Sequence, residues 1–243
     1  MNLTFAEQYK ALEGRFRTQA GAEGSVFLPN VPPAVPVDFV FIAMEPSLQS
    51  WSTSPGDARA RIAAGFMNFL FSMEDFILHF CVRSYLCGQG ETYYLTDLTK
   101  GAMPVTRAQK NRRERYDLWY PLLLEELAIV AKPSARIYTV GGQVQCYLRR
   151  KGFGWHTVRL LHYSGQAARY RERAVQGRER EFARFAQTLR HEAVLAMAEK
   201  VMVEAGLPSE MVGKTLARLG RCKLTDSRKK LIFTYYAEFT RRS

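Results

Sequence analysis

The stretch that decides the fold reads Val37-Asp38-Phe39-Val40-Phe41-Ile42-Ala43-Met44-Glu45-Pro46-Ser47. Its apolar residues run directly into an acid and a proline, which predicts a buried strand that ends in a tight turn. In open α/β sheets ligands bind beyond the carboxyl ends of the strands, so Glu45 stands where such folds place their chemistry. A strand that merely ends in a polar turn has the same pattern, and both interpretations stay open at this point.

Three more strands are expected along the chain, each leading into a turn: Thr92–Thr96, Arg136–Val140 and Thr157–Leu161. Helical patterns separate them, and strands that alternate with helices predict an α/β three-layer sandwich with a central, mostly parallel sheet. The ends of the four strands, marked by Glu45, Asp97, Gly141-Gly142 and His162, are then expected to meet at one edge of the sheet.

The pattern becomes helical beyond about Gly177. We therefore expect an α/β domain over residues 1–177 and a helical C-terminal appendage over residues 178–243. Between Asp97 and about Arg115 we expect a basic loop, which leads into a helix.

Composition indicates the kind of partner. The chain has 243 residues, and its 35 Lys and Arg residues exceed its 23 Asp and Glu residues, giving a formal charge of +12. Such an excess favours a polyanion such as nucleic acid, although a merely soluble basic protein would also show it. The N-terminus lacks a signal-peptide pattern, and no apolar stretch approaches the roughly 18 residues of a membrane span. We therefore expect a cytoplasmic protein without a membrane partner.

Metal and cofactor chemistry has no support in the sequence. The four cysteines are scattered without a CxxC pair, at positions 81, 87, 146 and 222. Neither an HExxH motif nor the signature of the zinc deaminases is present, and no P-loop appears. We therefore expect no metal site and no cofactor.

The order and spacing of several segments resemble the uracil-DNA glycosylase superfamily, over roughly Val37 to Arg173. The segments that carry the resemblance are Ala43-Met44-Glu45-Pro46-Ser47, Thr96-Asp97-Leu98-Thr99-Lys100, Ile137-Tyr138-Thr139-Val140-Gly141-Gly142-Gln143 and His162-Tyr163-Ser164. They resemble the family's strand-end motif with proline, its central strand ending in Asn, its strand-to-helix turn and its late His-Pro-Ser-like loop. The resemblance implies a DNA glycosylase that flips a base out of the helix and leaves an abasic site.

The residue types agree with that chemistry. Breaking an N-glycosidic bond generates positive charge on the sugar and negative charge on the departing base. By position, the resemblance makes Glu45 the residue that activates water or stabilises the sugar cation, although Glu is one methylene longer than the family's Asp or Asn. His162 would stabilise the departing base or contact a phosphate, and a purely structural hydrogen bond is its alternative role.

Asp97 departs from the family pattern in an informative way. The matching Asn of uracil-excising relatives donates to O4 of the base and accepts from N3, whereas an aspartate accepts from the N4 amine of cytosine and, when protonated, donates to N3. We therefore expect a modified cytosine, such as the hydroxymethylated or glucosylated forms of some phage DNA, and an antiviral role. A helix N-cap is the alternative role of Asp97.

Further contacts follow from the resemblance and the charge pattern. Pro46, Ser47 and Phe66 are expected at the base, with Trp51 as a second candidate for stacking, although both aromatic residues also suit a core. We expect contacts to DNA from Lys100, Ser164, Arg169 and Tyr170. The basic residues Arg107, Lys110, Arg112, Arg113, Arg115, Arg171 and Arg173 would support them, and the loop Gly165–Tyr170 would supply a wedge.

Two other functions stay open. A noncatalytic DNA-binding protein could keep the fold and its basic face, because each motif is imperfect. An unrelated α/β enzyme could use Gly141-Gly142 as a phosphate turn, although a glycine pair is a weak signal. Within the glycosylase reading, no lysine is placed as a Schiff-base nucleophile, which favours a monofunctional enzyme. A glycosylase of this kind could also excise uracil instead of a modified cytosine.

Overall fold

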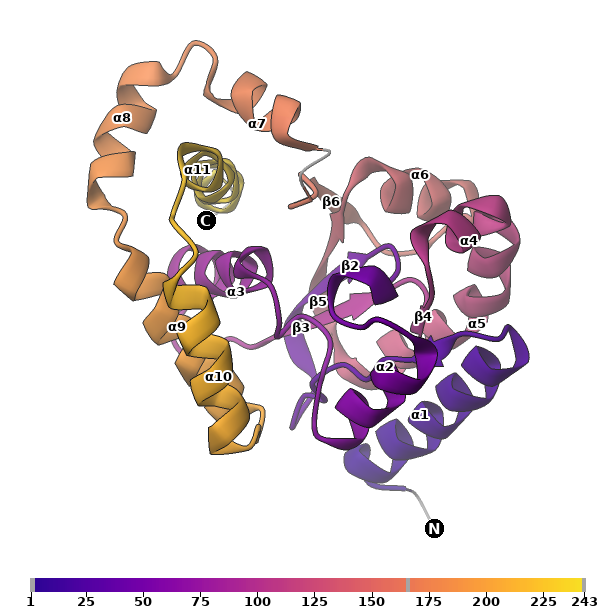
Figure 1. Ribbon diagram of the computed structural model, residues 1–243. Helices are drawn as coiled ribbons and strands as arrows, with labels where there is room; N and C mark the ends of the chain where they lie inside the picture. Colours follow the sequence, from indigo (N-terminus) through magenta and orange to yellow (C-terminus); the bar gives the residue numbers. More distant parts are fainter. Residues whose placement is uncertain (1–2, 165–166, 242–243) are drawn as a thin grey trace. The chain divides into compact units, whose positions relative to one another are not determined.

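The computed structural model describes residues 3–164 and 167–241 (Figure 1). Its elements are, in chain order, α1 (Phe5–Ala22), β1 (Val26–Phe27), β2 (Val37–Ala43), η1 (Leu48–Ser50), α2 (Pro55–Ala63), α3 (Met73–Tyr85), β3 (Tyr93–Asp97), β4 (Gly101–Ala102), α4 (Val105–Lys110), α5 (Arg112–Val130), β5 (Ala131–Val140), α6 (Gly142–Arg150), β6 (Thr157–Leu160), α7 (Ala168–Val175), α8 (Glu179–Thr188), α9 (His191–Glu204), α10 (Ser209–Gly220) and α11 (Asp226–Thr240). The segment expected to be a basic loop before Arg115 is instead helical, because α4 and the first turn of α5 lie within it.

A four-stranded sheet with the order β3-β2-β5-β6 lies at the centre of the fold. Strand β2 pairs in parallel with both β3 and β5, and Ala43 lies opposite Asp97. All of β2 except Asp38 is buried. Burial on both faces explains why its sequence is a nearly continuous apolar run rather than an alternation. The α/β architecture predicted from the alternation of strands and helices, with further helices at the C-terminal end, is confirmed.

Contacts within the chain define two compact units. The first unit consists of Met1–Asn68 and Glu91–Arg159, and the second consists of Phe69–Gly90 and Leu160–Ser243. This division differs from the single boundary expected near residue 177. The reason is that α3, from the first half of the sequence, packs against α9 and α11. The helical unit is therefore discontinuous in sequence.

In the first unit, side chains of the sheet and of helices α1, α5 and α6 share one buried cluster. These elements are labelled in Figure 1. Val40 and Ile42 of β2 lie in one buried cluster with Leu123 and Leu127 of α5 and Val144 of α6. Residues four apart on α5 thus face the sheet together, as helix geometry requires. Helix α5 is held in this way against the strands whose ends carry the predicted site residues.

In the second unit, α11 is the central helix and contacts α3, α7 and α8. Its buried side chains are Leu231, Ile232, Phe233, Tyr235, Ala237 and Phe239. The hydroxyl of Tyr235 donates a 2.7 Å hydrogen bond to the carbonyl oxygen of Leu161. This bond fixes the chain just after β6, immediately before His162. Within the described residues, no helix combines the length and the apolar character that crossing a membrane would require.

Replacing Leu123 by Ala should lower the free energy of unfolding by about 2–5 kcal/mol, because it removes a fully buried side chain from the cluster under the sheet. Leu118→Ala is the matched control, since Leu118 lies on the same helix but is 57% exposed. It should change stability by less than about 0.5 kcal/mol. Urea denaturation followed by circular dichroism measures both, and equal effects would contradict the described packing of α5.

Candidate functional site

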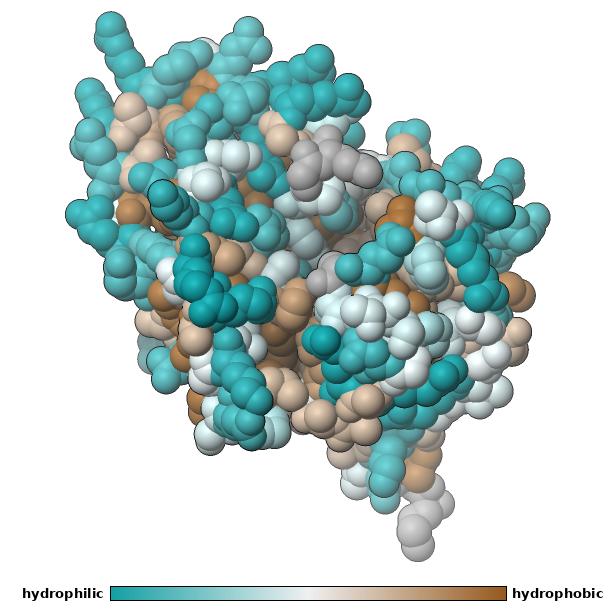
Figure 2. All heavy atoms as spheres, viewed as in Figure 1, coloured by the Kyte–Doolittle hydropathy of each residue, from teal (hydrophilic) through white to brown (hydrophobic). Residues whose placement is uncertain are grey.

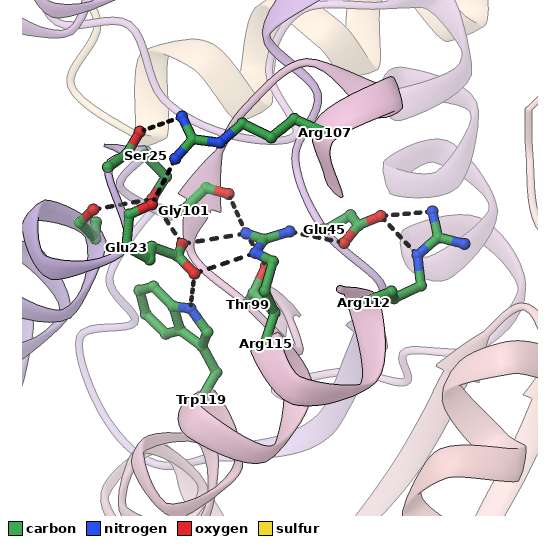
Figure 3. A network of polar contacts seen from close by, with 11 residues as sticks. Glu23, Ser25, Glu45, Thr99, Gly101, Arg107, Arg112, Arg115 and Trp119 are labelled. Carbon is green, nitrogen blue, oxygen red and sulfur yellow. Dashed lines mark hydrogen bonds and ion pairs between the residues drawn. The ribbon is translucent and has the colours of Figure 1, made fainter. Parts of the chain in front are cut away.

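Glu45 lies just beyond the end of β2, and its carboxylate is held by two arginines of α5 (Figure 3). Arg112 donates to Glu45 Oε1 from Nη2 at 2.7 Å and from Nε at 3.0 Å. Arg115 donates from Nη1 to Oε2 at 3.0 Å. The side chain of Glu45 is only 8% exposed, so these ion pairs lie largely out of water. Guanidinium groups only donate hydrogen bonds, so both oxygens of Glu45 act as acceptors in these pairs.

These contacts do not use one of the acceptor positions on the carboxylate of Glu45. Each carboxylate oxygen can accept about two hydrogen bonds. Arg112 supplies two to Oε1, whereas Arg115 supplies one to Oε2. A water molecule at Oε2 would therefore complete the coordination of the carboxylate.

Arg115 is itself anchored from behind (Figure 3). Its Nε and Nη2 both lie 3.1 Å from the carboxylate of Glu23, which also accepts a 3.1 Å hydrogen bond from the indole of Trp119. Nη2 further donates to the carbonyl oxygen of Gly101 at 2.8 Å. A Cβ at Gly101 would lie 2.0 Å from Glu23 Oε1, so only glycine permits this approach. The position of Arg115 is thus set by several groups besides Glu45.

Asp97 ends β3 and is 3% exposed. Its Oδ2 accepts a 2.6 Å hydrogen bond from the side-chain amide of Asn68. The same amide nitrogen lies 3.0 Å from Oδ1 of Asn30. No helix begins at Asp97, because β4 follows it at Gly101, so the alternative role as a helix N-cap is wrong.

Lys100 does not lie on the surface. It is 1% exposed, and its ammonium group lies 2.6 Å from Glu126 Oε2 and donates to the carbonyl oxygen of Asp97 at 2.6 Å. The expectation that Lys100 contacts DNA is therefore wrong, because its charge is already paired inside the protein. Its actual partner, Glu126 of α5, is fully buried and also accepts hydrogen bonds from Tyr94 and Thr96.

Tyr116 connects the two acidic positions electrostatically. Burial raises the pKa of its phenol above the ordinary value, and the negative charges of Glu45 and Asp97 raise the pKa further. Its hydroxyl is buried and has no hydrogen-bond partner among the described residues. Buried hydroxyls are normally paired, so this group suits an additional water or ligand atom.

The other residues expected at the base also belong to the first unit. Pro46 is buried, and Ser47 forms an isolated parallel bridge with Met103. Phe66 is half-buried and stacks on Trp51, with ring centroids 4.5 Å apart. One face of each ring is therefore covered by the other ring.

His162 follows β6 and belongs to the second unit. Burial, and to a lesser extent the positive charge of Arg171, lowers the pKa of His162 to about 4. Its Nδ1 lies 3.0 Å from the backbone N–H of Ser164, which can only donate. The neutral ring therefore carries its proton on Nε2 and presents an N–H donor there.

The basic residues after His162 differ in exposure. Arg171 is 4% exposed and binds the backbone carbonyls of Tyr163 and Ser164, so the expectation of a phosphate contact from Arg171 is wrong. Arg169 and Tyr170 are exposed on α7, where the guanidinium of Arg169 lies 4.8 Å from the ring centre of Tyr170. Within the expected wedge loop, Gly165 and Gln166 lie outside the described residues.

The basic residues between β3 and α5 fall into two groups. Arg112 and Arg115 hold Glu45, and Arg107 donates to the carbonyl oxygens of Glu23 and Gly24. Lys110 and Arg113 are exposed. Lys110 and Arg113, together with the exposed Arg107, present charge to solvent, as a phosphate contact requires.

Among the residues that the structure describes, no three His, Cys, Asp or Glu side chains gather as a metal site would need. A scan against protein-family models, a search of curated proteins and a search of solved structures found no match to this chain.

The structure thus brings Glu45 and Asp97 to the ends of neighbouring parallel strands. Sequence reasoning missed Asn68, which donates a hydrogen bond directly to Asp97. It also missed Asn30, which is linked to Asp97 through Asn68, and Glu126, which is linked to Asp97 through Lys100. No motif surrounds these residues. The one available signal was that buried polar residues need partners, and it does not say which partners they have.

Stability should fall as the pH drops from about 6.5 toward 4, in part because of His162. Its folded-state pKa is about 4, below the ordinary value of 6.5, so the unfolded chain binds a proton in this interval before the folded chain does. In His162→Asn, whose amide oxygen can still accept from Ser164, this loss should be smaller. Urea denaturation at pH 7 and pH 4.5 gives the comparison, and an equal loss in both proteins would contradict the neutral buried state of His162.

Proposed function

We propose that this protein is a monofunctional DNA glycosylase that acts on a flipped, modified pyrimidine. The substrate that fits best is a hypermodified cytosine, hydroxymethylated or glucosylated as in some phage DNA, and the product is an abasic site. Such an activity would serve antiviral defence.

One observation carries this proposal. Two buried acids of different surroundings, Glu45 and Asp97, follow neighbouring parallel strands at the same edge of the sheet. The carboxyl ends of parallel strands are where α/β enzymes bind substrates. Glycosidic hydrolysis needs a carboxylate near the sugar and polar groups at the departing base, and two separate acids can meet these needs.

In the proposed reaction, the bond from C1′ of the sugar to the base nitrogen breaks, the oxygen of water bonds to C1′, and the proton that this water loses ends on the departing base. The bonding electrons leave with the base, and the positive charge that develops on the sugar is stabilised by the carboxylate of Glu45. The remaining acceptor position on Oε2 orients the water. Arg112 and Arg115 hold the carboxylate of Glu45 in place, which favours electrostatic stabilisation and the positioning of water.

His162 has the protonation state that a donor to the departing base would need. A neutral imidazole with its proton on Nε2 donates a hydrogen bond to a developing oxyanion without first losing a charge. Because the pKa of His162 is about 4, this state persists across the neutral pH range.

The exposed arginines of α7 and α8 would supply contacts to phosphates. These residues are Arg169, Arg173, Arg180 and Arg184. Figure 2 shows mostly hydrophilic residues over these two helices. Tyr170 lies among them, 41% exposed and flanked by the guanidiniums of Arg169 and Arg173, and is the candidate for insertion into the duplex.

A noncatalytic DNA-binding protein is the second candidate function. The observation in its favour is the double ion pair of Glu45, which is also what a purely structural acid would form. The two functions differ in whether any base is released.

Base release should depend on Glu45. Oligonucleotides that contain uracil, cytosine, hydroxymethylcytosine or glucosylated hydroxymethylcytosine are incubated with the protein, and cleavage by alkali reports abasic sites. We expect release of a modified cytosine, and a loss of about 10³-fold in Glu45→Gln with DNA affinity nearly unchanged.

Glu23→Gln is the matched control, because Glu23 pairs with the other side of the same Arg115. It should retain release within about tenfold, since it removes an equivalent ion pair without touching the proposed reacting atoms. Release by Glu45→Gln at the wild-type rate would remove Glu45 from the mechanism. Tight binding without release of any base would favour the noncatalytic function.

DNA affinity should depend on α7. The double variant Arg169→Gln/Arg173→Gln should weaken binding similarly for all sequences and reduce the slope of log affinity against log salt by about 2. Arg15→Gln, an exposed arginine of α1 paired with Glu125, should leave the slope unchanged. Fluorescence anisotropy at several salt concentrations measures this, and equal slopes for all three proteins would exclude α7 from the interface.

A further inference from the structure

A buried ion pair sets the direction of a hydrogen-bond network beneath Asp97. Glu126 and Lys100 are 0% and 1% exposed, and their charged groups are 2.6 Å apart. The ammonium group of Lys100 can only donate hydrogen bonds, and in this ion pair the carboxylate of Glu126 only accepts them. Every hydroxyl that contacts Glu126 must therefore donate to it.

Two hydroxyls meet that requirement. Tyr94 lies 2.9 Å from Glu126 Oε1, and Thr96 lies 3.0 Å from the same atom. Each hydroxyl has one proton, which these bonds use. Each can then only accept from its other neighbours, and both accept from Nδ2 of Asn30, at 3.2 Å and 3.0 Å.

The donor and acceptor roles of the next two side chains, the amides of Asn30 and Asn68, are fixed in the same way. Both Nδ2 protons of Asn30 are used by the hydroxyls, so its Oδ1 faces Asn68 as an acceptor. Nδ2 of Asn68 then donates one proton to Asn30 and the other to Oδ2 of Asp97, at 2.6 Å. The orientation of both amides is thus fixed by their partners. Oδ2 of Asp97 can only accept.

We propose that Asn68, oriented through Asn30, is a positioning residue that sets base specificity by fixing Oδ2 of Asp97 as the acceptor of its own hydrogen bond. This inference rests on the proposed glycosylase function. Asn68 determines which group of residue 97 faces it, and therefore which group is turned toward the base. An oxygen of Asp97 in that place accepts from the exocyclic amine of a cytosine-type base.

The test exchanges the hydrogen-bond donor and the acceptor between positions 97 and 68. In Asp97→Asn, the amide of Asn68 should bind the new side-chain oxygen, so that the new NH2 group faces the base and favours O4 of uracil. In Asp97→Asn/Asn68→Asp, the new carboxyl group at position 68 should donate its proton to Oδ1 of Asn30. Its other oxygen should accept from that NH2 group. The oxygen at position 97 would then face the base and favour the amine again.

The readout is the ratio of base release from a cytosine-type base to release from uracil. We expect Asp97→Asn to shift this ratio toward uracil by about tenfold or more, and the double variant to shift it back. Asp97→Asn/Asn111→Asp is the matched control, because Asn111 is exposed and undergoes the same chemical change. It should keep the uracil preference. A double variant at positions 97 and 68 that also keeps this preference would overturn the inference.

A second measurement does not require activity or any variant. Hydrogen exchange of side-chain amides in the wild-type protein, followed by NMR, should be far slower for Asn68 than for the exposed Asn111, because both Nδ2 protons of Asn68 are bonded. Exchange at equal rates would overturn the inference. Slow exchange at Asn68 together with no base release from any substrate would instead support the network and reject the proposed function.

Discussion

The buried ion pair between Lys100 and Glu126 is the interaction on which the polar interior of the first unit depends. Removing two charges from water is costly, and such a pair is weak evidence for stability. Its effect here is directional, because an acceptor-only carboxylate orients the hydroxyls of Tyr94 and Thr96. Loss of either charge would leave the other buried without its partner. Pairing with Glu126 is the reason that Lys100, which follows the strand ending at Asp97, lies inside the protein.

Helix α5 couples this network to the second acidic position. Its first turns carry Arg112 and Arg115, which hold Glu45, and a later turn carries Glu126. Apolar packing of Leu123 between these turns fixes the helix against the sheet. The two strand ends are therefore braced by one rigid element, and a displacement of α5 would disturb both acids together.

The sequence was sufficient to predict the sheet, because the apolar run that ends at Ala43 is long and is bounded by a proline. It also identified Glu45 and Asp97 as strand-end acids. It was insufficient for Lys100, since a basic residue in an expected loop is assumed to face solvent. Asn68 was missed for a different reason: its partners Asn30 and Asp97 are 38 and 29 residues away in the chain, and no local pattern records such a contact.

Glu45 and Asp97 differ in what surrounds them more than in how deeply they are buried. Glu45 meets two guanidinium groups, so its charge is balanced before any ligand arrives and its geometry is stiff. Asp97 meets the neutral amide of Asn68, which fixes one of its oxygens and adds no positive charge. Under the proposed function, a stiff carboxylate paired with cations suits the orientation of water, whereas an acceptor beside a neutral amide suits the recognition of an amine. We therefore propose Glu45 for the sugar and Asp97 for the base.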